Sequence, residues 1–419
     1  MVSARVRRMA IVAAGVIAVA SGPVFIASAS SSMPRTQGGS VLAVHAAQGG
    51  PVSAWRPPNT LDHVFIIMEE NHALDHTIGD VNSVTHRLSM PFLTALSKEY
   101  GQATKYYGVS HTSEPNYIAA TSGSTWGVNN DNGWHAGSTV AAKYIEGATT
   151  INKTYALPAN HYNHTNIVDE LDAAHIPWAA YMQAMPTAGF LGDSANGGLY
   201  LSKHNPFDLY NDVHNNSAVA KNIKPYSDMA SNLNSRNAPR YVWISPDICT
   251  DMHLGIYTTV GGFAKETPCP YSNKIGDPID EASKTVADNF VKQAVTTIMH
   301  SRAWTGNSAI FITSDESDYD ANNPAIGDYY SAAGCCDSPV LPPADPEVSV
   351  DFPGGVYGGG LVPMVVISRT GPHHATDATA YNHYSMLLTI EEGLGLGKLG
   401  YTSDAAQVKP MWPLISSHR

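Results

Sequence analysis

Short apolar runs alternate along the chain with longer segments of helical pattern. Five runs rich in aliphatic and aromatic residues are bounded by polar breaks, and they cover residues 64–68, 176–182, 241–244, 309–312 and 361–368. Such runs are typical of strands that are buried on both faces. Helical patterns cover residues 91–100, 167–175, 279–304 and 384–394. The alternation predicts an α/β fold, a three-layer α/β/α sandwich with a mostly parallel central sheet.

The first residues have the pattern of an export signal. Three arginines precede an apolar stretch over residues 9–20, and small residues at 27–29 match the spacing that signal peptidase reads. We therefore expect residues 1–29 to be a cleaved signal peptide. A retained anchor is the weaker alternative, because a Gly-Pro pair at 22–23 interrupts the stretch. The protein is then expected to be secreted, extracellular or associated with the cell envelope, without a stable membrane anchor.

Composition and charge indicate the domain organisation and argue against one class of function. Residues 30–60 are rich in Ser, Gly, Ala and Pro and predict a flexible leader, followed by one catalytic domain over 61–410. The net charge is −12, with 36 acidic and 24 basic residues. This balance argues against a nucleic-acid-binding surface, which needs clustered lysine and arginine. Because the predicted compartment is oxidising, disulfides are permitted.

Four cysteines are available for such bonds, namely Cys249, Cys269, Cys335 and Cys336. The pairing expected first is Cys249 with Cys269. The adjacent Cys335 and Cys336 leave the three possible connectivities open.

Acidic residues follow three of the predicted strands. They are Glu69 and Glu70 with Asn71, then Asp247 and Asp251 with His253, and finally Asp315 and Glu316. Ligands of parallel sheets bind beyond the carboxyl ends of the strands. Carboxylates gathered and buried there need a cation or a reacting group between them. The alternative is that each acid only caps the loop or helix that follows it.

The stretch from Gly108 to Thr125 contains a candidate nucleophile. Ser113 lies two residues before Pro115 and three before Asn116, at a possible helix start. A serine held there by a rigid turn could attack phosphorus, with backbone N–H groups directed at an anion. The alternative is an ordinary Ser-Pro turn that caps a helix. The chain lacks Gly-X-Ser-X-Gly, His-Glu-X-X-His and the phosphate-loop motif, which argues against the corresponding hydrolases and nucleotide-binding proteins.

Seven stretches together resemble a known family. In chain order they are HVFIIMEENHALDHTIG, SHTSEPNYIAATSG, WAAYMQAMP, KHNPF, SPDICTDMH, FITSDESD and YNHYSMLLTIEEGLGL. They resemble the bacterial phosphoesterase family of acid phosphatases and phospholipases C, within the alkaline-phosphatase-like superfamily. The resemblance covers most of the chain from Leu61 to Leu396, and it implies an alkaline-phosphatase-like fold.

The resemblance also implies roles for individual residues. It implies a metal site formed by Glu70, Asn71, Ser113, Asp315 and Glu316, with Asp251, His253 and His383 as further candidate ligands. Ser113 would be the nucleophile, with the adjacent Thr112 as the less favoured choice. Asn116 would stabilise a phosphoryl oxygen, and His111, His204 and His383 would be catalytic, although a structural role for His204 stays open. The oxygen donors suit Ca²⁺, Mg²⁺ or Mn²⁺ and the histidines suit Zn²⁺, so a divalent metal ion is expected without a choice among them, and one or two ions fit.

The expected activity is hydrolysis of small phosphate esters, and an acid-phosphatase-like phosphomonoesterase is favoured. A phospholipase C or another phosphodiesterase of the same family is the alternative. A secreted binding protein with an inactive site is the alternative of another class. A sulfatase is disfavoured, because no C/S-x-P-x-R sequence occurs. Two departures from the family pattern are Gln183 in place of a glutamate, which puts a metal-binding role for that position in doubt, and Ser314 in place of a tryptophan.

Overall fold

The computed structural model describes residues 59–128, 131, 133–134, 139–146, 149–156, 161–253, 269–270, 275–318, 333–338 and 358–416. The predicted signal peptide and nearly all of the predicted leader lie outside this part of the chain. Within it, every helix is too short or too polar to span a membrane.

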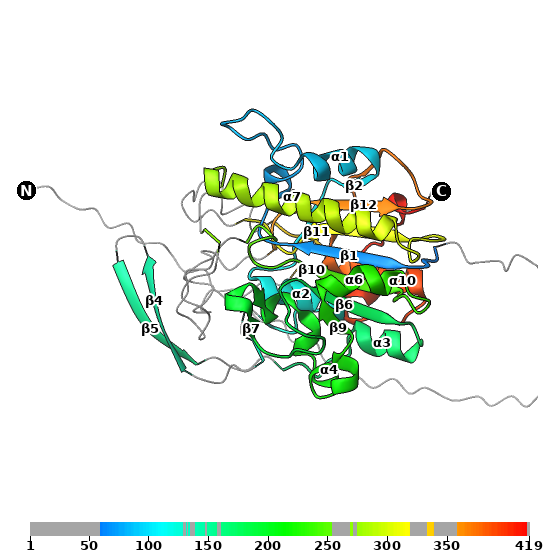
Figure 1. The fold of residues 1–419 in the computed structure, drawn as a ribbon, viewed down its shortest axis with the longest axis horizontal. Coiled ribbons are helices and arrows are strands. Elements are labelled where there is room, and N and C mark those ends of the chain that lie inside the picture. Colours follow the sequence, from blue (N-terminus) through cyan, green and yellow to red (C-terminus); the bar gives the residue numbers. More distant parts are fainter. Residues whose placement is uncertain are drawn as a thin grey trace, which may run out of the picture. The chain divides into compact units, whose positions relative to one another are not determined.

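An eight-stranded sheet forms the centre of the fold (Figure 1). Its strands, in spatial order, are β13 (Ala375–Asp377), β2 (Gly101–Ala103), β12 (Met364–Ser368), β11 (Ala309–Ser314), β1 (Val64–Glu69), β10 (Tyr241–Ser245), β6 (Trp178–Met182) and β9 (Ile223–Pro225). Strands β11, β1, β10, β6 and β9 are parallel, whereas β12 is antiparallel to both of its neighbours. The predicted mostly parallel sheet is confirmed.

Helices cover both faces of the sheet, because side chains of β1 alternate between two apolar cores. On one face, Phe65 and Ile67 pack with α1 (Pro91–Glu99), α6 (Met229–Leu233) and the long α7 (Pro278–Met299). On the other face, Ile66 packs with α2 (Ser113–Ser122), α3 (Ile167–Ala173) and α10 (His383–Leu394). Figure 1 shows α7 running alongside β1. The three-layer α/β/α arrangement is therefore confirmed.

The described part of the chain also contains smaller elements. Two short helices follow one another, α4 (Asn211–His214) and α5 (Ser217–Ala220). Three pairs of strands lie outside the main sheet, namely β3 (Tyr106–Tyr107) with β14 (Tyr381–Asn382), β4 (Thr139–Glu146) with β5 (Thr149–Ala156), and β7 (Ser194–Ala195) with β8 (Tyr200–Leu201).

Two disulfides occur among the described cysteines. Cys249 bonds to Cys269, as predicted, and the adjacent Cys335 and Cys336 bond to each other.

Strand register and helix ends determine where the candidate site residues lie. Glu69 at the end of β1 pairs with Ser314 at the end of β11, so the next residues, Glu70 and Asp315, leave the sheet side by side. Helix α10 is capped at its start by Asn382, whose side chain accepts hydrogen bonds from the first turn, and at its end by Gly395 with φ 74°. That left-handed conformation favours glycine.

Candidate active site

The carboxyl ends of three neighbouring strands are joined by backbone hydrogen bonds. Glu70 N–H donates to the Asp251 carbonyl (2.9 Å), and Asp315 N–H donates to the Glu69 carbonyl (3.0 Å). Asn71 N–H donates to Asp315 Oδ1 (3.2 Å). The acids that follow β1, β10 and β11 therefore lie together at one edge of the sheet, as ligand sites in parallel sheets do.

The candidate nucleophile lies between two carboxylates from different strands. Ser113 is the first residue of α2, and its Oγ donates to Glu70 Oε2 at 2.9 Å and lies 3.3 Å from Glu316 Oε1. Tyr117, one helical turn further on, donates its hydroxyl to Glu70 Oε1 at 2.6 Å. Residues four apart share a helix face, so α2 presents both hydroxyls to the same acid.

The loop before α2 is held by Asn116. Its Oδ1 accepts from the N–H groups of Val109 (2.7 Å) and Ser110 (3.0 Å), and its Nδ2 donates to the carbonyls of Ser110 (2.7 Å) and Thr112 (2.9 Å). Both amide hydrogens are thus engaged by the backbone. The contacts of Asn116 hold the loop that precedes the candidate nucleophile. The expected contact with a phosphoryl oxygen would require one of these hydrogen bonds to be exchanged.

A close approach of three backbone segments fixes this loop against the acids. Gly359 N–H donates to the Gly108 carbonyl (3.0 Å), and Ser317 N–H donates to the Gly359 carbonyl (2.7 Å). A Cβ atom at Gly108 would lie 2.8 Å from both the Asp315 carbonyl oxygen and Gly359 Cα. Only glycine fits there without moving backbone, because real Cβ contacts are longer.

Two of the predicted catalytic histidines contact the acids that follow β11. His111 is buried, and its Nδ1 contacts Glu316 Oε2. The His383 ring contacts the Asp315 carbonyl through Nε2 (2.5 Å) and the Tyr106 hydroxyl through Nδ1 (2.9 Å). Since a carbonyl only accepts, Nε2 carries the proton and Nδ1 accepts from the tyrosine. Burial lowers the pKa of His383 to about 4. His383 is therefore neutral, and both of its ring nitrogens are engaged.

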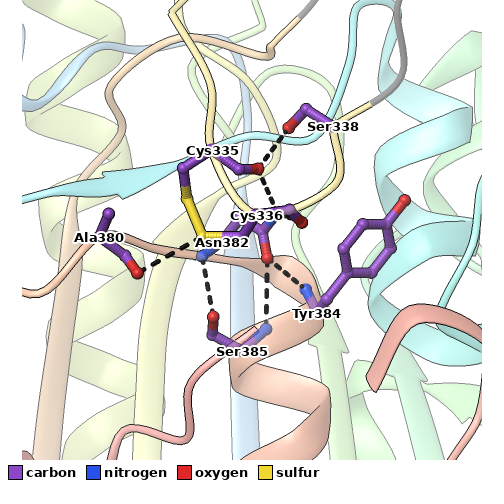
Figure 2. Close-up of a disulfide and its surroundings, with 7 residues drawn as sticks. All are labelled: Cys335, Cys336, Ser338, Ala380, Asn382, Tyr384 and Ser385. Carbon is purple, nitrogen blue, oxygen red and sulfur yellow. Dashed lines mark hydrogen bonds between the residues drawn. A yellow bond between two sulfur atoms is a disulfide. The ribbon is translucent and has the colours of Figure 1, made fainter. Parts of the chain in front are cut away.

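The start of the helix that carries His383 is tied to the vicinal disulfide (Figure 2). Asn382 Oδ1 accepts from the N–H groups of the second and third residues of α10 (3.0 and 3.3 Å). Its Nδ2 donates to the carbonyls of Cys335 and Cys336, both at 3.0 Å. One asparagine side chain thus caps the helix and holds the disulfide-bonded turn against it.

A second grouping shares Glu70 with the first. This grouping consists of Glu70, His204 and His253. Each offers one ligand atom, and these three atoms lie within 4.8 Å of one another, so the group could hold a metal ion. His204 Nε2 is 3.2 Å from Glu70 Oε1, and His204 Nδ1 is 3.2 Å from Asp251 Oδ2. Asp251 Oδ1 accepts from His253 N–H (2.8 Å). The His204 ring stacks on Tyr117, with centroids 5.5 Å apart.

The charges at this edge repel one another. Burial raises the pKa of Glu70, Asp251 and Asp315 well above the usual range, and neighbouring carboxylates raise each pKa further. Asp315 Oδ2 is buried and has no hydrogen-bond partner among the described residues. An unpartnered buried carboxylate oxygen is costly unless a cation binds it. The residues present therefore fit a divalent metal ion, and the oxygen donors of Glu70, Ser113, Asp315 and Glu316 are those that hard cations prefer.

Three residues at the site were missed from the sequence. They are Tyr117, Lys203 and Asp131. Lys203 Nζ lies 3.0 Å from both His253 Nε2 and Asp131 Oδ2. The spacing of Tyr117 four residues after Ser113 was a usable signal, and Lys203 directly precedes a predicted site histidine. Asp131 belongs to no recognisable motif. Gln183, in contrast, accepts a hydrogen bond from Asp247 N–H through Oε1 at 3.0 Å, a backbone contact rather than a role among the acids.

Comparison with known proteins shows the family of the chain. A model described as the phosphoesterase family matches residues 85–265 and 278–397, so the chain belongs to the phosphoesterase family. The resemblance seen in the sequence is thereby confirmed.

Curated relatives are named as phosphatases. The chain is 25% identical over 314 residues to the phosphate-repressible acid phosphatase of Penicillium chrysogenum, covering 74% of this chain and 55% of that protein. It is 29% identical over 211 residues to a probable acid phosphatase of Kluyveromyces lactis, covering 49% of this chain and 42% of that protein. It is 22% identical over 353 residues to the phosphatidylinositol-3-phosphatase of Mycobacterium tuberculosis, covering 84% and 83%. The chain thus spans about half the length of the two fungal relatives.

Solved structures with a similar fold include murine ectonucleotide pyrophosphatase/phosphodiesterase 5, at 11% identity and a TM-score of 0.42, covering 81% of this chain and 96% of that one. Another is a lipoteichoic acid synthase from Listeria monocytogenes, at 11% identity and a TM-score of 0.45, covering 86% and 77%.

Proposed function

We propose that the chain is a metal-dependent phosphoesterase that hydrolyses small phosphate esters, preferably phosphomonoesters, with Ser113 as the nucleophile. The observation that carries this proposal is the position of Ser113 Oγ at the start of α2, 2.9 Å from Glu70 and 3.3 Å from Glu316. The family match and the relatives named as acid phosphatases support the reaction class.

In the proposed reaction, Ser113 Oγ forms a bond to phosphorus while the bond to the ester oxygen breaks and the alcohol leaves. Water then hydrolyses the phosphoserine and releases phosphate. A divalent ion held by Glu70, Ser113, Asp315 and Glu316 would supply positive charge for the hydroxyl and the phosphoryl oxygens.

Proton transfer follows the observed contacts. The Ser113 hydroxyl proton is donated to Glu70 in the resting arrangement, so this carboxylate is placed to accept it. His111 contacts Glu316, whose Oε1 lies 3.3 Å from Ser113 Oγ, so its ring is close to the reacting hydroxyl. The His383 ring is held by the Tyr106 hydroxyl and the Asp315 carbonyl.

The test is turnover of a chromogenic phosphomonoester by the purified chain, before and after chelation and metal return. Ser113→Ala should reduce turnover at least about a thousandfold, as expected when a nucleophile is removed, with the fold retained. Thr112→Val tests the neighbouring hydroxyl and should retain most of the activity. Full activity in Ser113→Ala would refute the nucleophile assignment. A protein that binds metal but releases no phosphate would be the binding protein of the alternative hypothesis.

The substrate class is separated by a panel of a phosphomonoester, a phosphodiester and phosphatidylcholine. We expect the monoester to be hydrolysed fastest, consistent with the names of the relatives. Faster hydrolysis of phosphatidylcholine would favour the phospholipase C alternative.

We also propose that the protein is exported. The disulfide between Cys249 and Cys269 supports this, because such bonds persist mainly in oxidising compartments. Recovery of the intact chain, with its N-terminus uncleaved, from the cytoplasm alone would contradict export.

A further inference from the structure

Lys203 is a buried cation that the proposed reaction does not yet use. Its side chain is 7% exposed, and its Nζ lies 3.0 Å from Asp131 Oδ2 and 3.0 Å from His253 Nε2. Since an ammonium group has no acceptor capacity, Nζ donates to both atoms. Lysine is almost never buried unless it is paired, so the fold places this charge beside His253 through specific contacts.

This charge acts on the carboxylates of the candidate metal site. Lys203 Nζ contacts His253 Nε2, and ligand atoms of His253, His204 and Glu70 lie within 4.8 Å of one another, so the lysine places a positive charge beside this group.

The balance of charges at the candidate site indicates a role for Lys203 in binding an anion. The edge of the sheet carries the carboxylates of Glu70, Asp251, Asp315 and Glu316, all buried. One divalent ion cannot neutralise four carboxylates, and a phosphomonoester dianion adds two further negative charges. Binding such an anion in a site that excludes water needs an additional fixed cation.

The counter-ion of Lys203 is at the start of the helix that carries the nucleophile. Asp131 Oδ1 accepts from Glu114 N–H at 2.9 Å, and Glu114 directly follows Ser113 in α2. Asp131 therefore bridges the lysine and the α2 backbone with its two oxygens. A phosphoryl group attached to Ser113 would bring its own anionic oxygens to the same neighbourhood.

We propose that Lys203 binds a non-bridging oxygen of the substrate phosphoryl group, and that Asp131 is an internal anion that competes with the substrate for Lys203. The inference rests on the proposed function, because it concerns the same site. The ligand class is a phosphomonoester or free phosphate. In this arrangement Lys203 supplies a second positive charge beside a single divalent ion.

The proposal predicts opposite effects for the two members of one ion pair. Lys203→Met should weaken the equilibrium binding of inorganic phosphate to the metal-loaded protein by roughly ten- to hundredfold, the range for a lost charged hydrogen bond. Asp131→Asn keeps an acceptor for Glu114 N–H but removes the competing charge, so it should tighten phosphate binding by about fivefold. Calorimetric titration with inorganic phosphate measures both.

Lys284→Met is the matched control. Lys284 is also a buried lysine, and its Nζ lies 2.9 Å from both Asp80 Oδ2 and Asp280 Oδ2. Its loss should lower thermal stability and leave phosphate affinity within about twofold of the wild type, because its partners are structural. Metal content is measured on each variant, so that a change in phosphate affinity is compared at equal loading.

The outcomes separate a binding role from a structural one. If the ion pair only stabilises the fold, Asp131→Asn leaves phosphate affinity unchanged or weaker, and the proposal is overturned. If Lys203→Met does not fold, the direction of the Asp131→Asn effect decides alone. Turnover of the chromogenic ester is recorded separately. If Lys203→Met weakens and Asp131→Asn tightens phosphate binding, but the wild type shows no turnover, this inference is supported and the proposed function is refuted. If the wild type shows turnover and neither variant changes phosphate affinity, the proposed function is supported and this inference is refuted.

Discussion

Replacing Asp315 with asparagine is expected to stabilise the metal-free protein and to abolish most of the stabilisation that a divalent ion provides. Burial, and then the charge of Glu316, raises the pKa of Asp315 well above its usual range. Its Oδ2 has no partner among the described residues, while its Oδ1 accepts from Asn71 N–H at 3.2 Å. Asparagine keeps the Oδ1 acceptor and removes the charge.

The magnitude follows from these contacts. Removing a buried, unpartnered carboxylate charge should raise the unfolding free energy of the metal-free protein by about 1–3 kcal/mol. A metal ion at a hundred times its dissociation constant stabilises a native protein by about 2.7 kcal/mol. For a domain of roughly 350 residues, with an unfolding entropy near 2.1 cal/mol/K per residue, that stabilisation raises the melting temperature by about 4 °C. Asp315→Asn should therefore melt higher in chelator and gain little from metal.

Asp318→Asn is the matched control, since Asp318 lies three residues further along the same loop. Its oxygens accept from Ala73 N–H and His76 Nδ1, both at 2.7 Å. Although burial opposes it, the contact with His76 lowers the pKa of Asp318. Its substitution should lower the unfolding free energy by about 1.5–3 kcal/mol, with the metal-dependent gain retained.

Differential scanning calorimetry in chelator and in excess divalent ion measures the melting temperatures of the wild type and of both variants. The reasoning is refuted if Asp315→Asn melts lower than the wild type in chelator and still shows the full metal-dependent rise.

Three further predictions concern single side chains. Tyr117→Phe removes the donor to Glu70 and should lower kcat by about tenfold, so an unchanged kcat in steady-state assays would exclude a role for this hydroxyl. Burial raises the pKa of Glu391 from 4.5 to about 8, so its stabilising contribution is complete below pH 4.5 and is lost as the pH rises through 8. Denaturant titrations should then show Glu391→Gln more stable than the wild type at pH 8, by on the order of 2–4 kcal/mol, and a deficit at pH 8 would contradict the assignment. Asn382 caps α10, and Asn166 caps α3 by accepting a hydrogen bond from Val168 N–H. Asn382→Ala and Asn166→Ala should therefore each cost about 1–2 kcal/mol, but only Asn382→Ala should also reduce turnover, because its helix begins at a site histidine. Equal turnover losses would disprove that link.

The long elements of the fold could be predicted because their patterns are local. The run over residues 64–68 became β1, with all six residues of the strand buried, and the pattern over 279–304 became α7. Strands of three residues, such as β2 and β13, carry too few positions for a recognisable period. The antiparallel direction of β12 depends on the path of the chain before it, which the apolar run at 361–368 does not encode.

The candidate site was predictable in part for a similar reason. Glu70 and Asp315 directly follow strands, and register alone brings them together. The contacts of His383 and Lys203 depend on tertiary structure. Both nitrogens of His383 are engaged by Tyr106 and the Asp315 backbone, and no sequence pattern specifies those contacts. Lys203 reaches the site only because the turn over residues 202–204 packs beside α2.

The proposed function depends on attack by Ser113 on phosphorus at the edge of the sheet where the strand-end carboxylates meet. The most direct measurement is peptide mass spectrometry of the metal-loaded protein after brief incubation with a phosphomonoester and acid quenching. A phosphate group is expected on Ser113 and none on the Ser113→Ala protein. Phosphate on Thr112 or on a histidine, or turnover without any modification of Ser113, would contradict it.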